Sequence, residues 1–360
     1  MAPAVADGFA VATTDGGHTI TDHLGYDDAK WGLKSPGNVD WYTFLDFAYV
    51  GLHDMARIGK FATEPYYGTP PSRSYFYGAS TGGRQGLMFA QKYPKDFDGI
   101  VSIFPAINWA RFILSNIWPQ FVMNRLGVYP PGCELDAFTN AAISACDQLD
   151  GVIDGIISLP GLCTFDPHVV VGKSFDCDGI ESVFTSAGAD VAEAAWSGPR
   201  SSTGEFQWYG LSKDATLGSA GIGVATTSCQ KDGTCKGVPF VISTSWVKYW
   251  LTKDPDFDIS KITHEEWDEL QHASITEFQS AIDTADPDLS QFRKTGGKIL
   301  AWHGLIDPVI SPNGTTDYYD KVLALDPKAH DFFRLFLVPG SAHSFAEGPT
   351  PKNLLNTTIK

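Results

Sequence analysis

The segment Gly78-Ala79-Ser80-Thr81-Gly82 contains the residues expected of a serine nucleophile on a sharp turn. It fits the pattern G-x-S-x-G, in which a strand turns abruptly into a helix and exposes the serine hydroxyl at the strand tip. Glycines two positions before and after the serine are expected because a strained turn leaves no room for side chains. The alternative is an ordinary glycine-rich turn at the start of a helix. The position between a strand-like run and a helix-like run favours a nucleophile.

A serine hydroxyl attacks an acyl carbon when a base takes its proton and an acid orients that base. On a parallel sheet the partners follow in the order serine, aspartate or glutamate, histidine. Asp307 follows one late apolar run, in HGLIDPVISP, and His343 follows the last one, in PGSAHSF. We therefore predict a triad of Ser80, Asp307 and His343, with the backbone N–H of Thr81 as an oxyanion donor. A turn residue before a proline is the alternative for Asp307.

The chain has nine histidines, and the others fit the role of base less well. His303 precedes Asp307 at a strand end and is expected to shape the loop that contains Asp307. His330 precedes the last strand and so lies at the wrong end of the sheet. The remainder come before Ser80 or fall in the middle of the chain: His18, His23, His53, His168, His264 and His272.

The sequence also predicts the elements that must position these side chains. Apolar runs predict buried strands at 8–15, 74–80, 99–106, 297–304 and 332–340. Helical spacing of apolar residues predicts helices at 39–60, 81–93 and around 314–325. Strands that alternate with helices form a parallel sheet covered on both faces, so the predicted fold class is α/β.

This alternation stops after about Trp109 and resumes near Gly296. Between these points the chain is rich in Gly, Ser, Asp and Trp and contains every cysteine. We interpret this part as an inserted domain.

The composition limits the classes of function. The chain carries a net charge of -16 without a cluster of Lys and Arg, which argues against binding to nucleic acid or to an anionic membrane surface. It contains no run of about 18 apolar residues that would span a membrane. The acidic balance suits a soluble protein that handles neutral or aromatic small molecules, and a hydrophobic content of 43% allows a substantial core.

The six cysteines are Cys133, Cys146, Cys163, Cys177, Cys229 and Cys235. Three disulfides formed in an oxidising compartment are the simplest interpretation. Zinc is the alternative, but the close Cys or Cys/His spacings that it usually needs are absent. Glycosylation sequons at Asn313 and Asn356 are consistent with a secreted glycoprotein, although no signal peptide is recognisable.

Four blocks of the sequence together resemble the tannase and feruloyl esterase family: YFYGASTGGRQGLMFAQKYPKDFDGIVS, CDQLDGVIDGII, AWHGLIDPVISP and VPGSAH. The resemblance covers nearly the whole chain, and this order of blocks is highly specific. It implies an α/β-hydrolase catalytic domain, residues 1–110 and 296–360, interrupted by a lid domain, residues 111–295. It also implies a secreted serine esterase that uses the predicted triad on esters of phenolic acids.

The second block is interpretable from its residues as well. Asp147, Asp150 and Asp154 lie close enough in the sequence to surround a hard cation with oxygen donors, which suits Ca²⁺. The spacing differs from that of an EF-hand, and a solvated acidic turn is the alternative. The resemblance implies a structural Ca²⁺ site in the lid, formed by these aspartates and the backbone oxygens of Val152 and Ile156.

The same region contains the cysteines. The expected disulfides are Cys146–Cys163 around the acidic loop, Cys229–Cys235 around the turn-like QKDGT, and Cys133–Cys177 as the remaining pair.

Two features depart from the family pattern. Family members have disulfide-bonded cysteines beside the catalytic serine and histidine, where this chain has Ala79 and Ser344. They also have a segment before the strand that matches 8–15, with a glycine-rich turn that provides an oxyanion N–H. This chain begins almost at that strand, so we expect N-terminal strands of the family to be missing and Thr81 to be the remaining donor.

We therefore predict an esterase that hydrolyses feruloyl-type or galloyl-type esters through an acyl-enzyme on Ser80. Its expected partner is a small phenolic ester of plant cell-wall or tannin origin, with no nucleic-acid or membrane partner. The aromatic segments EFQWYG and WVKYW offer flat surfaces for an aromatic acyl group, although such residues more often form core. The alternative is a catalytically impaired family member that binds phenolic esters without turnover. A metal-dependent hydrolase is a third hypothesis.

Overall fold

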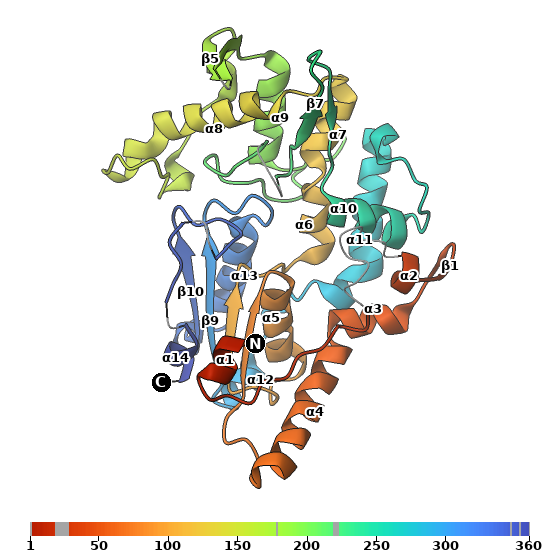
Figure 1. Cartoon of the computed structure of the whole chain (residues 1–360), viewed down its shortest axis with the longest axis vertical. Helices are drawn as coiled ribbons and strands as arrows, with labels where there is room; N and C mark the ends of the chain where they lie inside the picture. The colour runs from red at the N-terminus through yellow and green to blue at the C-terminus, as the bar shows by residue number, and fades with distance from the viewer. Residues whose placement is uncertain are drawn as a thin grey trace.

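The computed structural model describes residues 2–18, 29–177, 179–218, 223–345, 348–352 and 354–359. At its centre lies a four-stranded parallel sheet with the strand order β10-β9-β4-β3 (Figure 1). Its strands are β3 (Tyr75–Ala79), β4 (Gly99–Ile103), β9 (Lys298–Gly304) and β10 (Phe333–Val338). All four were predicted, and their parallel pairing confirms the α/β class.

Alternate residues along these strands contribute to two separate cores. On one face, Ile100, Ile299 and Phe333 pack with residues of the sheet-covering helices. These helices are α5 (Thr81–Lys92), α12 (Ser290–Lys294) and α13 (Pro312–Leu325). On the other face, Val101 and Trp302 pack against α14 (Leu354–Ile359). Because strand side chains alternate between faces, helices on both sides are needed to bury both sets.

The strand predicted at 8–15 is absent, so this prediction is wrong. Residues 9–15 have no regular structure and are mostly exposed, and they follow the short helix α1 (Ala2–Ala6). The segment lies instead against the helix that contains Gly59: a Cβ placed on Gly59 would lie 2.9 Å from the Cβ of Ala12. A strand requires a hydrogen-bonded neighbour, and within the described residues this segment has none.

The single helix predicted at 39–60 is two helices, α3 (Trp41–Ala48) and α4 (Val50–Tyr67). They are separated at Tyr49, whose φ is -166°. The buried guanidinium of Arg84 explains the break, because it donates to the carbonyls of Phe47 (3.3 Å) and Ala48 (3.0 Å). In an uninterrupted helix these carbonyls would accept from backbone N–H groups four residues further on.

Before α3 the chain forms α2 (Ala29–Gly32) and a small hairpin of β1 (Leu33–Ser35) and β2 (Asn38–Val39).

The chain leaves the sheet after β4 and returns to the neighbouring strand β9. The helices between them, besides α12, are α6 (Trp109–Ser115), α7 (Trp118–Leu126), α8 (Gly132–Cys146), α9 (Ser186–Ser197), α10 (Val241–Ser245) and α11 (His264–Ile282). Two hairpins accompany them, β5 (Ser174–Cys177) with β6 (Ile180–Val183) and β7 (Thr227–Cys229) with β8 (Cys235–Gly237). In Figure 1, α7, α8 and α9 lie above the sheet, whereas α10 and α11 lie beside it.

The expected disulfides are all present in this part of the chain. They are Cys133–Cys177, Cys146–Cys163 and Cys229–Cys235. The first joins α8 to β5, the second closes the acidic loop after α8, and the third joins β7 to β8.

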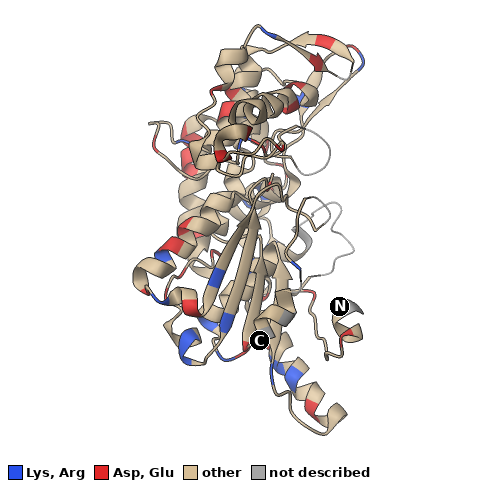
Figure 2. Ribbon diagram, turned by 90° about the vertical axis from the view of Figure 1, so that its left-hand side faces the viewer, with Lys and Arg blue, Asp and Glu red and all other residues tan. Residues whose placement is uncertain are grey.

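Lys and Arg as well as Asp and Glu occur along the described part of the ribbon (Figure 2). Within the described residues, none of the helices combines the length and the apolar character needed to cross a bilayer.

Candidate active site

Ser80 lies on the turn between β3 and α5 in a conformation that non-glycine residues rarely adopt. Its φ is 59° and its ψ is -120°, and a positive φ costs energy in a residue with a side chain. Three backbone hydrogen bonds hold it there: the N–H of Ser80 donates to Ile103 (2.9 Å), and its carbonyl oxygen accepts from Arg84 (3.1 Å) and Ala106 (3.1 Å). Such enforced strain is common at functional sites. The end of β4 therefore supports the turn that exposes the serine.

The steric role of the glycines differs in part from the prediction. A Cβ on Gly78 would lie 2.3 Å from the carbonyl oxygen of Gly82, so the first glycine is required. A Cβ on Gly82 itself would meet no atom within 4 Å, so the expectation of a crowded position there is wrong. The crowded position is Gly83, where a Cβ would lie 2.6 Å from the carbonyl oxygen of Ile103. The first turn of α5 packs directly against β4 at that point.

The structure brings the three predicted triad residues into one hydrogen-bonded chain. Nε2 of His343 lies 3.0 Å from Oγ of Ser80, and Nδ1 of His343 lies 2.7 Å from Oδ2 of Asp307. Because a carboxylate only accepts hydrogen bonds, Nδ1 carries the proton and Nε2 is free to accept the serine proton. The residues come from loops after β3, β9 and β10, which end at the same edge of the sheet. This arrangement is suited to base-assisted attack by a serine.

Asp307 is fully buried, and its second oxygen accepts hydrogen bonds from the backbone N–H groups of Val309 (2.9 Å) and Ile310 (2.8 Å). Burial alone would raise the pKa of Asp307. The charge of His343 and hydrogen bonds from His303 and His343 outweigh that effect and hold the pKa well below its usual range. Asp307 is therefore a carboxylate that can orient His343 and stabilise its charged form.

His303 supports the same carboxylate, as its position before Asp307 suggested. Its Nε2 lies 3.1 Å from Oδ2 of Asp307 and 3.0 Å from the carbonyl oxygen of Ile310. Since both partners are acceptors, Nε2 carries a proton. Nδ1 of His303 lies 2.8 Å from Oγ1 of Thr315 on α13.

Two neighbours of the triad were not found from the sequence. Thr315 fixes His303, and the ring of Phe104 packs 4.5 Å from that of His343. Both contacts join segments that are distant in the sequence, so local spacing gives no signal for them.

Thr81 is the first residue of α5, directly after Ser80. The first N–H groups of a helix have no acceptor within the helix and lie at the positive end of its dipole. The backbone N–H of Thr81 is therefore suited to stabilise a developing negative charge beside Ser80.

A cavity of about 370 Å³ adjoins Ser80 and His343. Its walls are largely apolar and come from α6, from residues 238–242 and from the loop after β9. The aromatic residues among them are Trp109, Phe112 and Phe240. The segments EFQWYG and WVKYW do not line it, since Trp208, Trp246 and Trp250 are buried in a core cluster. The core alternative is therefore correct for these tryptophans.

The acidic loop after α8 begins with a turn of 3₁₀ helix, Asp147–Asp150. Oδ1 and Oδ2 of Asp147 accept from the backbone N–H groups of Asp154 (3.2 Å) and Gly155 (3.0 Å). The pKa of Asp147 is lowered, mainly by the N–H of Gly155, with smaller effects that include the side chain of Asp154. The loop thus places three aspartates on one short turn, although in the described residues their carboxylate oxygens do not form a group within 4.8 Å of one another. Oxygen donors of this kind are the ligands that Ca²⁺ prefers.

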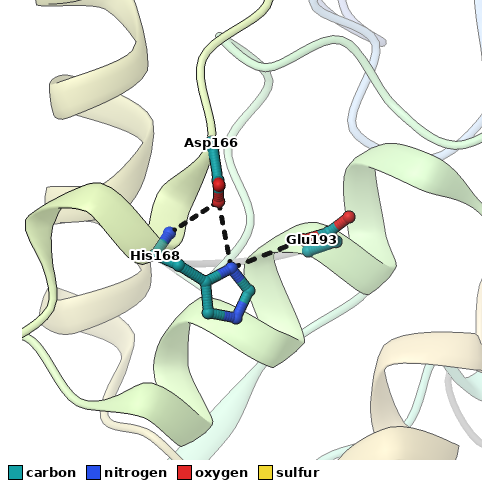
Figure 3. Close-up of side chains that lie close together, drawn as sticks. All are labelled: Asp166, His168 and Glu193. Carbon is teal, nitrogen blue, oxygen red and sulfur yellow. Dashed lines mark hydrogen bonds and ion pairs between the residues drawn. The ribbon is translucent and has the colours of Figure 1, made fainter.

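A different acidic group has its ligand atoms closer together. In the described part of the chain, Asp166, His168 and Glu193 form a group of three whose ligand atoms lie within 4.8 Å of one another and could hold a metal ion. Figure 3 shows His168 between the two carboxylates. Hydrogen bonds to Asp190 and Asp166 raise the pKa of His168. A protonated His168 would neutralise these exposed carboxylates without a metal.

Comparison with known proteins was made in sequence and in structure. Residues 1–359 match the family described as "Tannase and feruloyl esterase". The chain is 40% identical to a probable feruloyl esterase of Arthroderma benhamiae, over 100% of this chain and 67% of that protein. It is 27% identical to a tannase of Aspergillus oryzae, over 99% of this chain and 68% of that protein.

Solved structures give the same result. A tannin acyl hydrolase from Aspergillus niger superimposes with a TM-score of 0.83 at 25% identity, covering 91% of this chain and 64% of that chain. Feruloyl esterase B from Aspergillus oryzae gives a TM-score of 0.75 at 27% identity, covering 94% and 64%. The chain thus spans about two thirds of the length of these proteins, and its fold is of the α/β-hydrolase type.

Proposed function

Because this chain belongs to the tannase and feruloyl esterase family, we propose that it is a serine esterase that hydrolyses esters of phenolic acids. The observation that carries the proposal is the hydrogen-bonded chain from Asp307 through His343 to Ser80 beside a largely apolar cavity. The proposed substrates are small feruloyl-type or galloyl-type esters of plant origin.

In the proposed reaction, Oγ of Ser80 attacks the ester carbonyl carbon while Nε2 of His343 takes the serine proton. The N–H of Thr81 stabilises the negative charge on the carbonyl oxygen. The bond to the alcohol then breaks, and His343 gives its proton to the departing oxygen. Water attacks the acyl-enzyme with His343 again as the base, which releases the phenolic acid and restores Ser80.

We propose that residues 111–295 form a lid on a catalytic domain made of 1–110 and 296–360. The two segments of that domain contain the sheet and the triad, and the middle segment contributes much of the cavity wall, including Phe112 and Phe240. A cavity between two such parts can exclude water from the acyl group.

We also propose that the acidic loop binds Ca²⁺ through the carboxylates of Asp147, Asp150 and Asp154 and the backbone oxygens of Val152 and Ile156. The support is the oxygen donor set and the lowered pKa of Asp147. Bound Ca²⁺ would neutralise the loop and stabilise the lid; it has no part in the ester chemistry above.

The three disulfides support a protein of an oxidising compartment, and we propose that it is secreted. Asn313 is exposed on α13, which is compatible with use of its sequon.

The function is tested by hydrolysis of methyl ferulate and methyl gallate, with release of the free acid as the readout. Turnover by the wild type should disappear in Ser80→Ala. The matched control is Ser144→Ala, which removes an exposed hydroxyl on α8 and should leave turnover unchanged. Equal release by wild type and Ser80→Ala would refute the serine mechanism. Binding of the esters without release of acid would favour the alternative of a binding protein without turnover.

A further inference from the structure

The cavity beside Ser80 contains very few polar side chains. Of the described lining residues, none carries a formal charge besides the titratable His343, and Thr226 is the one hydroxyl residue outside Ser80 and Thr81. The indole nitrogen of Trp109 is itself buried, so this residue presents mainly ring surface. Among the described lining residues, Thr226 is therefore the one polar side chain that a substrate ring could meet beyond Ser80, Thr81 and His343.

The hydroxyl of Thr226 is fixed by its surroundings. Its Oγ1 donates to the carbonyl oxygen of Gly223 (2.8 Å). The backbone oxygen of Thr226 accepts from Nε2 of Gln120 (2.8 Å) and from the N–H of Val238 (2.9 Å). A hydroxyl has one proton and two lone pairs. Since the proton is already used, Oγ1 can only accept a hydrogen bond from a bound molecule.

We propose that this cavity selects aromatic acyl groups with a single phenolic hydroxyl, which donates to Oγ1 of Thr226. The proposal rests on the esterase function above and specifies its substrate class. The ring position next to this hydroxyl can carry hydrogen or a methoxy group, as in a feruloyl group, because either one suits the apolar walls. Thr226 is thus a residue that determines specificity.

The same walls disfavour two other acyl groups. A galloyl ring brings three adjacent hydroxyls, and those without an acceptor lose their hydrogen bonds to water on binding. Each hydroxyl left without an acceptor lowers kcat/KM for the galloyl ester, relative to an ester with a single paired hydroxyl, by about tenfold or more. An acyl group with a second carboxylate would need a cationic partner, and the described lining includes no Lys or Arg.

The test compares kcat/KM for methyl 4-hydroxycinnamate, methyl 4-methoxycinnamate and methyl gallate. Methyl esters have a minimal alcohol, so the acyl group must fill the cavity. We expect the 4-hydroxy ester to exceed the 4-methoxy ester by about 2- to 10-fold, the range of one net hydrogen bond. Methyl gallate should be the slowest of the three.

Two variants of Thr226 test whether its hydroxyl causes the preference for the 4-hydroxy ester. In Thr226→Val the ratio between the 4-hydroxy and 4-methoxy esters should fall to about one, whereas Thr226→Ser should keep it. A variant that merely loosens the loop would lower the rates for both esters alike and leave their ratio unchanged. An unchanged ratio in Thr226→Val, or a wild type that prefers methyl gallate, would overturn the proposal.

A binding experiment separates this proposal from the proposed reaction. Dissociation constants for the same esters can be measured with Ser80→Ala by quenching of tryptophan fluorescence, since Trp109 lines the cavity. If the wild type shows no turnover but Ser80→Ala binds the 4-hydroxy ester more tightly, the esterase function fails and the selectivity of the cavity stands. Equal binding of the two esters would refute the selectivity regardless of turnover.

Discussion

At the scale of single residues, Asp307 shows how hydrogen bonds and a nearby charge keep a buried carboxylate ionised. It is fully buried, yet donors from His343, His303, Val309 and Ile310 surround its two oxygens. Burial alone would raise its pKa, but the charge of His343 and the hydrogen bonds from His303 and His343 hold the pKa well below the usual range. Asp307 therefore remains ionised wherever the protein is folded near neutral pH.

Replacing Asp307 with Asn should lower kcat by about 10⁴-fold, the effect seen when an orienting aspartate of a serine triad becomes an amide. The amide can donate to Nδ1 of His343, which favours the wrong tautomer. The measurement is steady-state hydrolysis of methyl ferulate at several pH values. Asp317→Asn, which removes a carboxylate paired with Lys321 on α13, is the matched control and should retain wild-type kcat. A loss below tenfold in Asp307→Asn would contradict the proposed role.

Asp283 illustrates the opposite case, a buried carboxyl whose pKa rises. It caps the end of α11, and its Oδ1 accepts from the N–H of Ala110 (2.7 Å). Burial raises its pKa to about 6, and the N–H of Ala110 together with the charges of Arg111 and Arg84 offsets only part of this effect. The folded state thus binds a proton between about pH 4 and 6 that the unfolded state has released.

This shift predicts how stability depends on pH. Stability contributed by Asp283 should fall as the pH rises from about 4 to about 6, by on the order of 2 kcal/mol. Asp283→Asn should remove this decline, because an amide keeps the bond to Ala110 without titrating. Urea midpoints of both proteins at pH 4, 5, 6 and 7 test the prediction. Parallel curves for the two proteins would exclude the proposed shift.

At the scale of elements, the sequence predicts the sheet well because its strands are short apolar runs between helices. The same reasoning fails at 8–15, since apolar residues alone do not make a run pair with a sheet. This segment packs against α4, although β3 has an unpaired outer edge within the described residues. It also misses the break at Tyr49, because the cause is Arg84, a residue far along the chain. Periodicity reports which face of an element is apolar and gives no information about such distant hydrogen bonds.

One contact between elements joins the acidic loop to the loop that holds His343. Gly340 follows β10 with a φ of +67°, and a Cβ on it would lie 2.8 Å from Cδ1 of Ile156. The acidic loop therefore packs against the turn three residues before the proposed base. Order in that loop should help to hold His343 against Ser80.

Gly340→Ala should therefore reduce both stability and kcat. A positive φ with a Cβ costs about 1–2 kcal/mol, and the contact with Ile156 would displace the His343 loop as well. The matched control is Gly127→Ala, where φ is +65° but no atom lies within 4 Å of a Cβ. Both variants should lower the urea midpoint, and only Gly340→Ala should lower kcat for methyl ferulate. An equal kcat in the two variants would show that the contact does not position His343.

At the scale of the whole molecule, the site lies where the sheet meets the segment between β4 and β9. The order of serine, aspartate and histidine along the chain predicts the triad, because the ends of parallel strands meet at one edge. The cavity was not predictable in the same way. Its walls combine α6 with residues 238–242, and neither segment carries a motif that relates it to the other. Selectivity toward substrates therefore depends on a packing between distant segments, and only the structure describes it.

The proposed Ca²⁺ site gives a prediction that concerns the entire fold. Removal of Ca²⁺ with a chelator should lower the unfolding temperature, because an ion bound only to the folded state stabilises it by about 3 kcal/mol at a hundredfold excess over its Kd. Ester hydrolysis at 25 °C should persist, since the proposed reaction uses no metal, but kcat should fall in part because the acidic loop packs against the turn before His343. Asp147→Asn should lose the stabilisation by added Ca²⁺, whereas Asp166→Asn, which alters the exposed group at His168, should retain it. If instead Asp166→Asn loses the stabilisation and Asp147→Asn retains it, the ion binds at the His168 group. Complete loss of hydrolysis in chelator while the circular dichroism spectrum stays native would instead support the metal-dependent hydrolase, since a loosened loop alone would leave part of the activity.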